Sequence, residues 1–180
     1  MNVAVLFAGG IGSRMNAGSV PKQFLEIHGK PIIVHTLEVF ESHPDIDAIA
    51  ISILPQGRVE LEKLVRRFEI SKVRWIVDGG ATGQSSRHRA LQAVAQDSPP
   101  ETLVLIHDGV RPLVDHHLIS ENIRVAGERG NAITCTKINE TIVISESDEI
   151  GEVIPREHLY AARAPQTFHL GEILDLFVRT

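Results

Sequence analysis

Short apolar stretches of strand length alternate with stretches of helical spacing along the first 130 residues. The strand-like stretches are Val3–Phe7, Ala48–Leu54, Val73–Val77 and Thr102–Ile106. Between them, in segments around 32–40, 59–68, 90–94 and 118–125, apolar residues recur every three or four positions, which is typical of amphipathic helices. This alternation predicts an α/β fold, with a mostly parallel sheet that carries helices on both faces.

The pattern changes after a further predicted strand, Asn131–Ile138. The stretch "ETIVISESDEIGEVIPRE" holds two short extended runs around the polar turn Ser145–Glu149, which predicts a protruding β-hairpin arm at about 137–157. A C-terminal helix is predicted from about Leu170. Because 180 residues without a repeat or a linker suit one core, we expect residues 1–180 to form a single domain that includes the arm.

Charge and cysteine content exclude several classes of protein. The net charge is −5 and no run of lysine and arginine occurs, so we expect no nucleic-acid partner. Apolar stretches reach only strand length and Met1–Ala4 lacks the features of a signal peptide, so we expect no membrane partner. Cys135 is the only cysteine, which excludes a disulfide framework and favours a cytoplasmic location.

Glycine and charged residues follow three of the predicted strands. "GGIGSR" follows the first strand, "DGG" follows Val73–Val77, and "HDGVRP" follows Thr102–Ile106. The carboxyl ends of parallel strands share one edge of the sheet, and ligands of open α/β sheets bind there. The sequence therefore predicts a binding cleft at this edge.

The first glycine cluster has the character of a phosphate site, because bare backbone N–H groups can approach an anion closely. Arg14 and Lys22 follow it and can supply positive charge. The dinucleotide fingerprint needs a carboxylate at the end of the second strand, where this chain has Leu54–Gln56. The Gly-Lys-Ser/Thr triplet of the Walker motif is also absent. Two cations beside an open loop instead suit a triphosphate that is attacked at its α-phosphorus.

Four separated motifs carry a family resemblance: "AGGIGSRM…PKQF", "DGG…SS", "HDGVRP" and "VIPREHLYAARAPQTF". From residue 3 to about residue 175 the chain resembles the cytidylyltransferases that join CTP to a polyol phosphate, including those that make CDP-ribitol and CDP-methylerythritol. The resemblance implies a Rossmann-like nucleotidyltransferase sheet, a Mg²⁺ cofactor, CTP and a polyol phosphate as substrates, and a homodimer built through the hairpin arm.

The resemblance also implies roles for individual residues. Arg14 and Lys22 match the catalytic cations that stabilise charge at the α-phosphate. The nucleotide-binding positions are Ala8, Gly9, Gly10, Gly12, Gly80, Ala81, Ser86 and Gly109. The acceptor-binding positions are Asp108, Arg111, Thr141 and Arg156. Asp108 is in addition a candidate metal ligand, and the two arm residues among these are implied to serve the neighbouring subunit.

The attacking phosphate is already an anion, so this chemistry needs neither an enzyme nucleophile nor a general base. We therefore interpret His107 as a packed histidine of its loop. The adjacent pair His116-His117 would point about 100° apart on a helix and make a poor chelate, so we interpret it as a helix start.

The acceptor is predicted to be D-ribitol 5-phosphate. Val143 stands where enzymes for methylerythritol phosphate commonly have a lysine, and the valine of "HDGVRP" is closer to ribitol-type members. 2-C-methyl-D-erythritol 4-phosphate is the alternative acceptor. Two more distant alternatives are a sugar nucleotidyltransferase that uses another nucleotide and a nucleotide-binding domain without catalysis.

Three departures from the family pattern accompany the resemblance. Gly83 replaces a usual arginine, although Arg87 and Arg89 lie nearby, and Ala164 replaces a polar residue before "PQTF". Related chains also continue beyond the position of Thr180, with a further lysine at the phosphates, a strand and a helix. This C-terminal part of the family is missing from the 180 residues.

Overall fold

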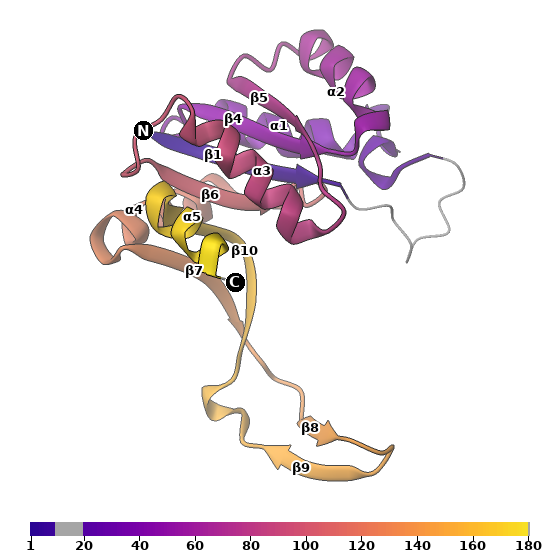
Figure 1. Ribbon diagram of the computed structural model, residues 1–180. Helices are drawn as coiled ribbons and strands as arrows, with labels where there is room; N and C mark the ends of the chain where they lie inside the picture. Colours follow the sequence, from indigo (N-terminus) through magenta and orange to yellow (C-terminus); the bar gives the residue numbers. More distant parts are fainter. Residues whose placement is uncertain (10–19, 180) are drawn as a thin grey trace.

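The computed structural model describes residues 1–9 and 20–179, and it places most of their strands in one twisted, six-stranded sheet (Figure 1). The strand order is β5-β4-β1-β6-β10-β7. The bounds of these strands are β1 Asn2–Ala8, β4 Ala48–Ile53, β5 Val73–Asp78, β6 Leu103–Asp108, β7 Asn131–Lys137 and β10 Tyr160–His169. Neighbours are parallel from β5 to β6, and β10 is antiparallel to both β6 and β7. The predicted, mostly parallel α/β sheet is confirmed.

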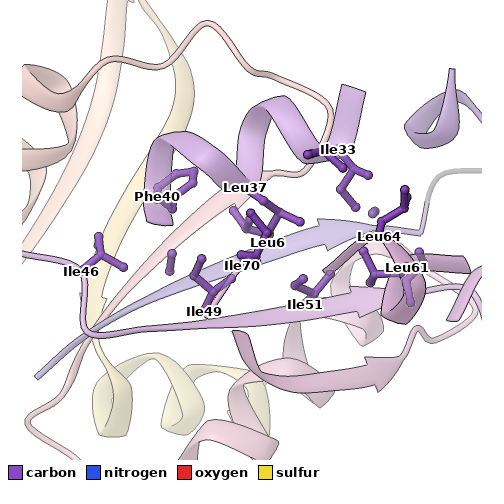
Figure 2. Packing of buried hydrophobic residues seen from close by; sticks show 14 of the residues in the cluster. Leu6, Ile33, Leu37, Phe40, Ile46, Ile49, Ile51, Leu61, Leu64 and Ile70 are labelled. Atoms are coloured by element: carbon purple, nitrogen blue, oxygen red, sulfur yellow. The ribbon is translucent and has the colours of Figure 1, made fainter. Parts of the chain in front are cut away.

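Five helices cover the two faces of the sheet. They are α1 Ile32–Ser42, α2 Pro55–Arg67, α3 Gly83–Ala95, α4 His116–Arg129 and α5 Leu170–Arg179. Side chains of α1 and α2 pack with Leu6, Ile49 and Ile51 of the sheet (Figure 2). Side chains of α4 belong to the same cluster. Side chains of α3 and α5 pack on the other face, with Val5 and Ala50. Successive residues of a strand face opposite sides of the sheet. The central strands lie between two layers of helices, so their residues are apolar on both faces.

Local signals explain where the helices begin and end. Asp115 caps α4 by accepting the N–H of Leu118 at 2.8 Å, so the helix begins at His116 as predicted. Gly130 ends the same helix with φ +91°, a conformation that glycine adopts without strain. The C-terminal helix begins at Leu170, also as predicted.

Between β1 and α1 the described chain forms a single 3₁₀ turn, η1 Lys22–Phe24, and a minimal hairpin. The hairpin strands are β2 Glu26–Ile27 and β3 Lys30–Pro31, joined at His28 and Gly29, which both have positive φ. This short segment positions Lys22 ahead of the first helix.

The predicted arm is confirmed as a hairpin that projects away from the sheet (Figure 1). It consists of β8 Ile142–Ser145 and β9 Ile150–Ile154, followed by the 3₁₀ turn η2 Arg156–His158. Four large apolar side chains of the arm are exposed, namely Val143, Ile144, Ile150 and Val153. At the base of the arm, Arg156 donates from Nη1 to the carbonyl oxygen of Asn139 at 2.7 Å.

Candidate active site

The carboxyl ends of β1, β5 and β6 meet at one edge of the sheet, as the sequence predicts. Two backbone hydrogen bonds join the turns there. The N–H of Gly79 donates to the carbonyl of Ile53 at 2.7 Å, and the N–H of Gly109 donates to the carbonyl of Phe7 at 3.0 Å. The glycine turns after β5 and β6 are thereby tied to β4 and β1, and all of them face a common edge.

Ser86 of α3 lies at the centre of this edge and is buried. Its Oγ accepts the N–H of Gly80 at 3.0 Å and donates to the carbonyl of Thr82 at 2.9 Å. An added Cβ on Gly79 would lie 3.1 Å from this Oγ, and one on Gly9 would lie 3.5 Å from it. The end of β1 at Gly9 and the turn after β5 therefore both come within contact distance of this one hydroxyl group.

The turn after β5 tolerates no side chain at Gly80. A Cβ there would overlap the hydroxyl of Ser85 and lie 2.6 Å from its Cβ. Ser85 is held in place by a capping box, in which its Oγ accepts the N–H of Thr82 at 2.9 Å and its own N–H donates to Thr82 Oγ1 at 3.0 Å. The exposed Ala81 therefore leads directly into a rigid N-terminus of α3, whose dipole favours an anion.

Two arginines, from helices on opposite faces of the sheet, contact the same turn. Arg89 of α3 donates from Nη1 to the carbonyl oxygens of Gly79 at 3.0 Å and Asp78 at 3.3 Å. Arg58 of α2 pairs with the Asp78 carboxylate at 3.3 Å and with Glu62 at 3.0 Å. The motif "DGG" marks the turn in the sequence, but no sequence signal identifies which arginines hold it.

The loop after β6 places Asp108 and Arg111 together. Their side chains form an ion pair, and the Arg111 N–H donates to the Asp108 carbonyl at 3.1 Å. His107 is buried against the ring of Phe40, with the ring centroids 5.5 Å apart, and its Nε2 donates to the carbonyl of Arg111 at 3.0 Å. This burial lowers the pKa of His107. The interpretation of His107 as a packed histidine of its loop is confirmed.

A hollow of about 540 Å³ opens beside the same loop. Arg111 and His107 line it from the loop, and Thr136, Arg163 and Ala164 line it from β7 and β10. Arg163 donates from Nε to Thr136 Oγ1 at 3.3 Å. Most of the other lining residues are apolar, namely Val110, Pro112, Leu113, Val114 and Leu118. The hollow is therefore mainly apolar, with two guanidinium groups that can bind a phosphate.

No hydrogen bond or ion pair within the described residues joins Lys22, Thr141 or Arg156 to these turns. Lys22 lies half-buried on η1. Thr141 and Arg156 belong to the arm, which stands apart from the edge within the chain (Figure 1). Gly10, Gly12 and Arg14 lie outside the described residues.

Two features are absent from the described residues. No three histidine, cysteine, aspartate or glutamate side chains gather into a metal-binding group within 1–9 and 20–179. No helix in this part of the chain is both long enough and apolar enough to cross a membrane.

The chain is similar to known cytidylyltransferases. Residues 2–180 match the family described as IspD, 2-C-methyl-D-erythritol 4-phosphate cytidylyltransferase. A ribitol-5-phosphate cytidylyltransferase of Streptococcus agalactiae serotype Ia is 45% identical over 177 residues, which are 98% of this chain and 74% of the relative. A 2-C-methyl-D-erythritol 4-phosphate cytidylyltransferase of Geobacillus kaustophilus is 40% identical over 172 residues, which are 96% of this chain and 73% of the relative.

Solved structures agree with this likeness. The 4-diphosphocytidyl-2C-methyl-D-erythritol synthase of Anaerococcus prevotii superimposes with a TM-score of 0.81 at 25% identity, over 99% of this chain and 74% of that one. The 2-C-methyl-D-erythritol 4-phosphate cytidylyltransferase of Thermus thermophilus has a TM-score of 0.71 at 27% identity, over 99% and 76% of the two chains.

Proposed function

The chain belongs to the IspD family of cytidylyltransferases, and on this premise we propose that it transfers CMP from CTP to D-ribitol 5-phosphate. An oxygen of the acceptor phosphate attacks the α-phosphorus, the bond from that phosphorus to the bridging oxygen breaks, and CDP-ribitol and pyrophosphate form. The choice of acceptor depends on one observation. The chain is 41–45% identical to the ribitol-5-phosphate cytidylyltransferases of Streptococcus agalactiae and Vibrio parahaemolyticus. 2-C-methyl-D-erythritol 4-phosphate is the second candidate, supported by the relatives at 33–40% identity that are named for it.

The cytidine end of CTP is assigned to the edge around Ser86. Ser86 Oγ accepts the N–H of the half-buried Gly80, so the backbone groups of the exposed Ala81 remain for the base. A backbone carbonyl accepts the exocyclic amine of cytosine, whereas uracil presents an oxygen at the same place. We expect this mismatch to cost UTP about 1–3 kcal/mol in binding.

The triphosphate is assigned to the glycine loop, with Lys22 and Arg14 as its cations. Negative charge grows on the leaving pyrophosphate and on the oxygens of the α-phosphorus. Fixed cations and the N-terminus of α3 stabilise that charge without having to reorganise during the reaction. The site also holds the acceptor phosphate next to the α-phosphate of CTP. This orientation of the two reacting groups supplies the rest of the rate acceleration.

The residues at the edge fit a Mg²⁺ ion that is shared with the nucleotide. Mg²⁺ is usually held by one or two carboxylates together with substrate phosphates and water, rather than by a protein cage. Asp108 lies at the carboxyl end of β6 and uses Oδ2 in its pair with Arg111, which leaves Oδ1 for the ion. The bound ion would neutralise phosphate charge, and Arg111 would keep the Asp108 side chain oriented.

A homodimer through the arm would complete the acceptor site. An isolated two-stranded hairpin is marginal in water, and this one exposes Val143, Ile144, Ile150 and Val153. Cover by a second copy would bury these side chains. It would also bring Thr141 and Arg156 of one subunit toward the hollow beside Arg111 of the other.

The dimer is tested by mixing two inactive variants, Arg156→Gln and Lys22→Met. If Arg156 serves the neighbouring subunit, exchange of subunits restores one intact site per mixed dimer and part of the activity returns. Persistent inactivity after subunit exchange has been verified by mass spectrometry would place Arg156 in the site of its own subunit.

The free thiol of Cys135, the only cysteine, suits a cytoplasmic location.

The reaction itself is tested by pyrophosphate release with each of the four nucleoside triphosphates, in the presence of Mg²⁺ and either acceptor. CTP with ribitol 5-phosphate should give the highest kcat/KM, and chelation of Mg²⁺ should abolish release. A clear preference for 2-C-methyl-D-erythritol 4-phosphate would overturn the acceptor, and a preference for UTP would overturn the nucleotide.

A further inference from the structure

Strand β10 has a β-bulge beside the carboxyl end of β6. Ala162 pairs with Cys135 of β7, and the next pair along these two strands is Gln166 with Ile133. Residues 163–165 of β10 therefore face a single residue of β7, whereas a regular antiparallel ladder places one residue opposite one. The pairing of β10 with β6 also begins only at Gln166. Bulges next to active sites commonly redirect a side chain.

The bulge brings two successive side chains of β10 to the same hollow. Successive residues of a regular strand face opposite sides of the sheet, yet Arg163 and Ala164 both line the hollow of about 540 Å³ beside the loop after β6. Thr134 and Thr136 line it from β7, where a spacing of two residues puts them on one face of the strand. The irregular pairing thus gives Arg163 a place in this hollow without removing Ala164 from it.

Arg163 is held through its backbone and its side chain. Its carbonyl oxygen accepts from Nε2 of Gln166 at 3.0 Å, and its own Nε donates to Thr136 Oγ1 at 3.3 Å. No carboxylate within 1–9 and 20–179 forms an ion pair with Arg163. The terminal nitrogens of this exposed guanidinium group are therefore available to an anion.

The charges around the hollow favour an anion. Arg111 lines it from the loop after β6, and the ion pair of Arg111 with Asp108 connects the hollow to the edge of the candidate active site. None of the described residues that line the hollow is an aspartate or a glutamate, although the net charge of the chain is −5. Most of the remaining lining is apolar, and apolar walls strengthen the attraction between a cation and an anion. Guanidinium groups bind phosphate through paired N–H donors, so a phosphate monoester suits this hollow.

We propose that Arg163 binds the phosphate group of the acceptor. This inference rests on the proposed function and adds to Arg111 a second cation of the same subunit at that phosphate. The bond to Thr136 orients Arg163 before the acceptor arrives, so less conformational entropy is lost on binding. The planar guanidinium group can then donate to two phosphate oxygens at once.

The kinetic experiment separates the acceptor from CTP. Pyrophosphate release is measured for the unaltered chain, Arg163→Gln and Arg163→Lys, with the acceptor varied at saturating CTP and Mg²⁺, and then with CTP varied at saturating acceptor. Ribitol 5-phosphate and 2-C-methyl-D-erythritol 4-phosphate are both used, because each carries the phosphate group. Arg74→Gln is the matched control, since Arg74 is exposed on β5, at the other edge of the sheet from β7.

A second measurement does not depend on turnover. Each acceptor is titrated calorimetrically into the same proteins with α,β-methylene-CTP bound, an analogue in which a carbon atom replaces the bridging oxygen so that CMP is not transferred. This gives the affinity for the acceptor while the nucleotide site is filled. Thermal unfolding of each variant verifies that it is folded.

Arg163→Gln should raise the KM for the acceptor and weaken its calorimetric affinity about 10- to 100-fold, with the KM for CTP within about twofold of the unaltered chain. Arg163→Lys should lose less affinity, because it keeps the charge but not the paired donors. Arg74→Gln should leave every value unchanged. The inference is overturned if Arg163→Gln keeps its KM and affinity for the acceptor, or if the KM values for acceptor and CTP rise together. Turnover by the unaltered chain would still support the proposed function in those cases, whereas its failure to use either acceptor would remove both.

Discussion

Ser86 Oγ accepts the backbone N–H of Gly80 at 3.0 Å, and this hydrogen bond joins the turn after β5 to the first turn of α3. The hydroxyl is buried and also donates to the carbonyl of Thr82, so it acts as both a hydrogen-bond acceptor and a hydrogen-bond donor within the protein. The shape of the proposed cytosine pocket therefore depends on a side chain that serves first to hold the backbone.

Ser86→Ala should lower kcat/KM for CTP about tenfold and reduce the free energy of unfolding by about 1–2 kcal/mol, because a buried N–H loses its partner. Steady-state kinetics and urea unfolding measure the two effects. Ser98→Ala is the control, since Ser98 makes only a long 3.9 Å contact with the sulfur of Met1. Unchanged kinetics in Ser86→Ala would remove the Gly80 turn from the nucleotide site.

Gly80→Ala should abolish most of the activity, because the new Cβ would overlap the hydroxyl of Ser85 and open the turn. Gly83→Ala, three residues further along, adds the same methyl group with nothing within 4 Å of it. As Gly83 is the first residue of α3, alanine there should be neutral or stabilise the protein by up to about 1 kcal/mol. Equal activity in both variants would contradict the tight turn.

Lys22→Met and Arg14→Met should each lower kcat by about 10²–10³, equivalent to about 3–4 kcal/mol of transition-state stabilisation. Lys63→Met is the matched control, since Lys63 is exposed on α2 and pairs only with Glu60 at 3.7 Å. Thermal unfolding verifies that the variants are folded. Near-normal turnover in both catalytic variants would refute the assignment of these two cations.

Asp108→Asn should raise the Mg²⁺ concentration needed for half-maximal activity at least about tenfold, because an amide oxygen is a weaker ligand than a carboxylate. It also removes the ion pair with Arg111. Asp148→Asn is the control, since Asp148 is an exposed turn residue with φ +59°, a conformation that asparagine also adopts. A Mg²⁺ titration curve identical to that of the unaltered chain would exclude Asp108 as a ligand.

The protein should lose stability in mild acid because of His43 and His107. Burial lowers the pKa of both imidazoles below the ordinary value of 6.5. At His43, Nδ1 accepts the Asp45 N–H at 3.1 Å and Nε2 donates to the His116 carbonyl at 3.1 Å, so a second proton would break the first bond. Lys72 lies beside the same residue and adds positive charge.

The sign of this effect follows from proton uptake. Below pH 6.5 the unfolded chain binds protons at these two sites that the folded chain does not, so the free energy of unfolding falls as the pH falls. Each site contributes a slope of up to about 1.4 kcal/mol per pH unit. Urea unfolding between pH 5 and 8 measures the slope, which should be smaller in His43→Gln and unchanged in His117→Gln, a change at an exposed histidine. A slope that His43→Gln leaves unaltered would assign the acid sensitivity elsewhere.

The sequence alone determined the α/β class, the arm and the edge at which the glycine turns meet. These features follow from local patterns: the period of apolar residues sets each element, and parallel strands necessarily end on the same side of the sheet. For this reason Gly80 and Asp108 could be assigned to one edge before any coordinates, whereas Ser86 was assigned only through the family resemblance. The packed role of His107 and the helix start at His116 were also predictable, because each depends on residues close in sequence.

Only the tertiary structure decided which distant residues touch. No local pattern predicted β10, which lies antiparallel between β6 and β7, because strand pairing over such a separation depends on the whole sheet. The Arg87 stack on Phe7 has the same origin. It exists because α3 packs across β1, β4 and β5, and the two residues that meet there are far apart along the chain.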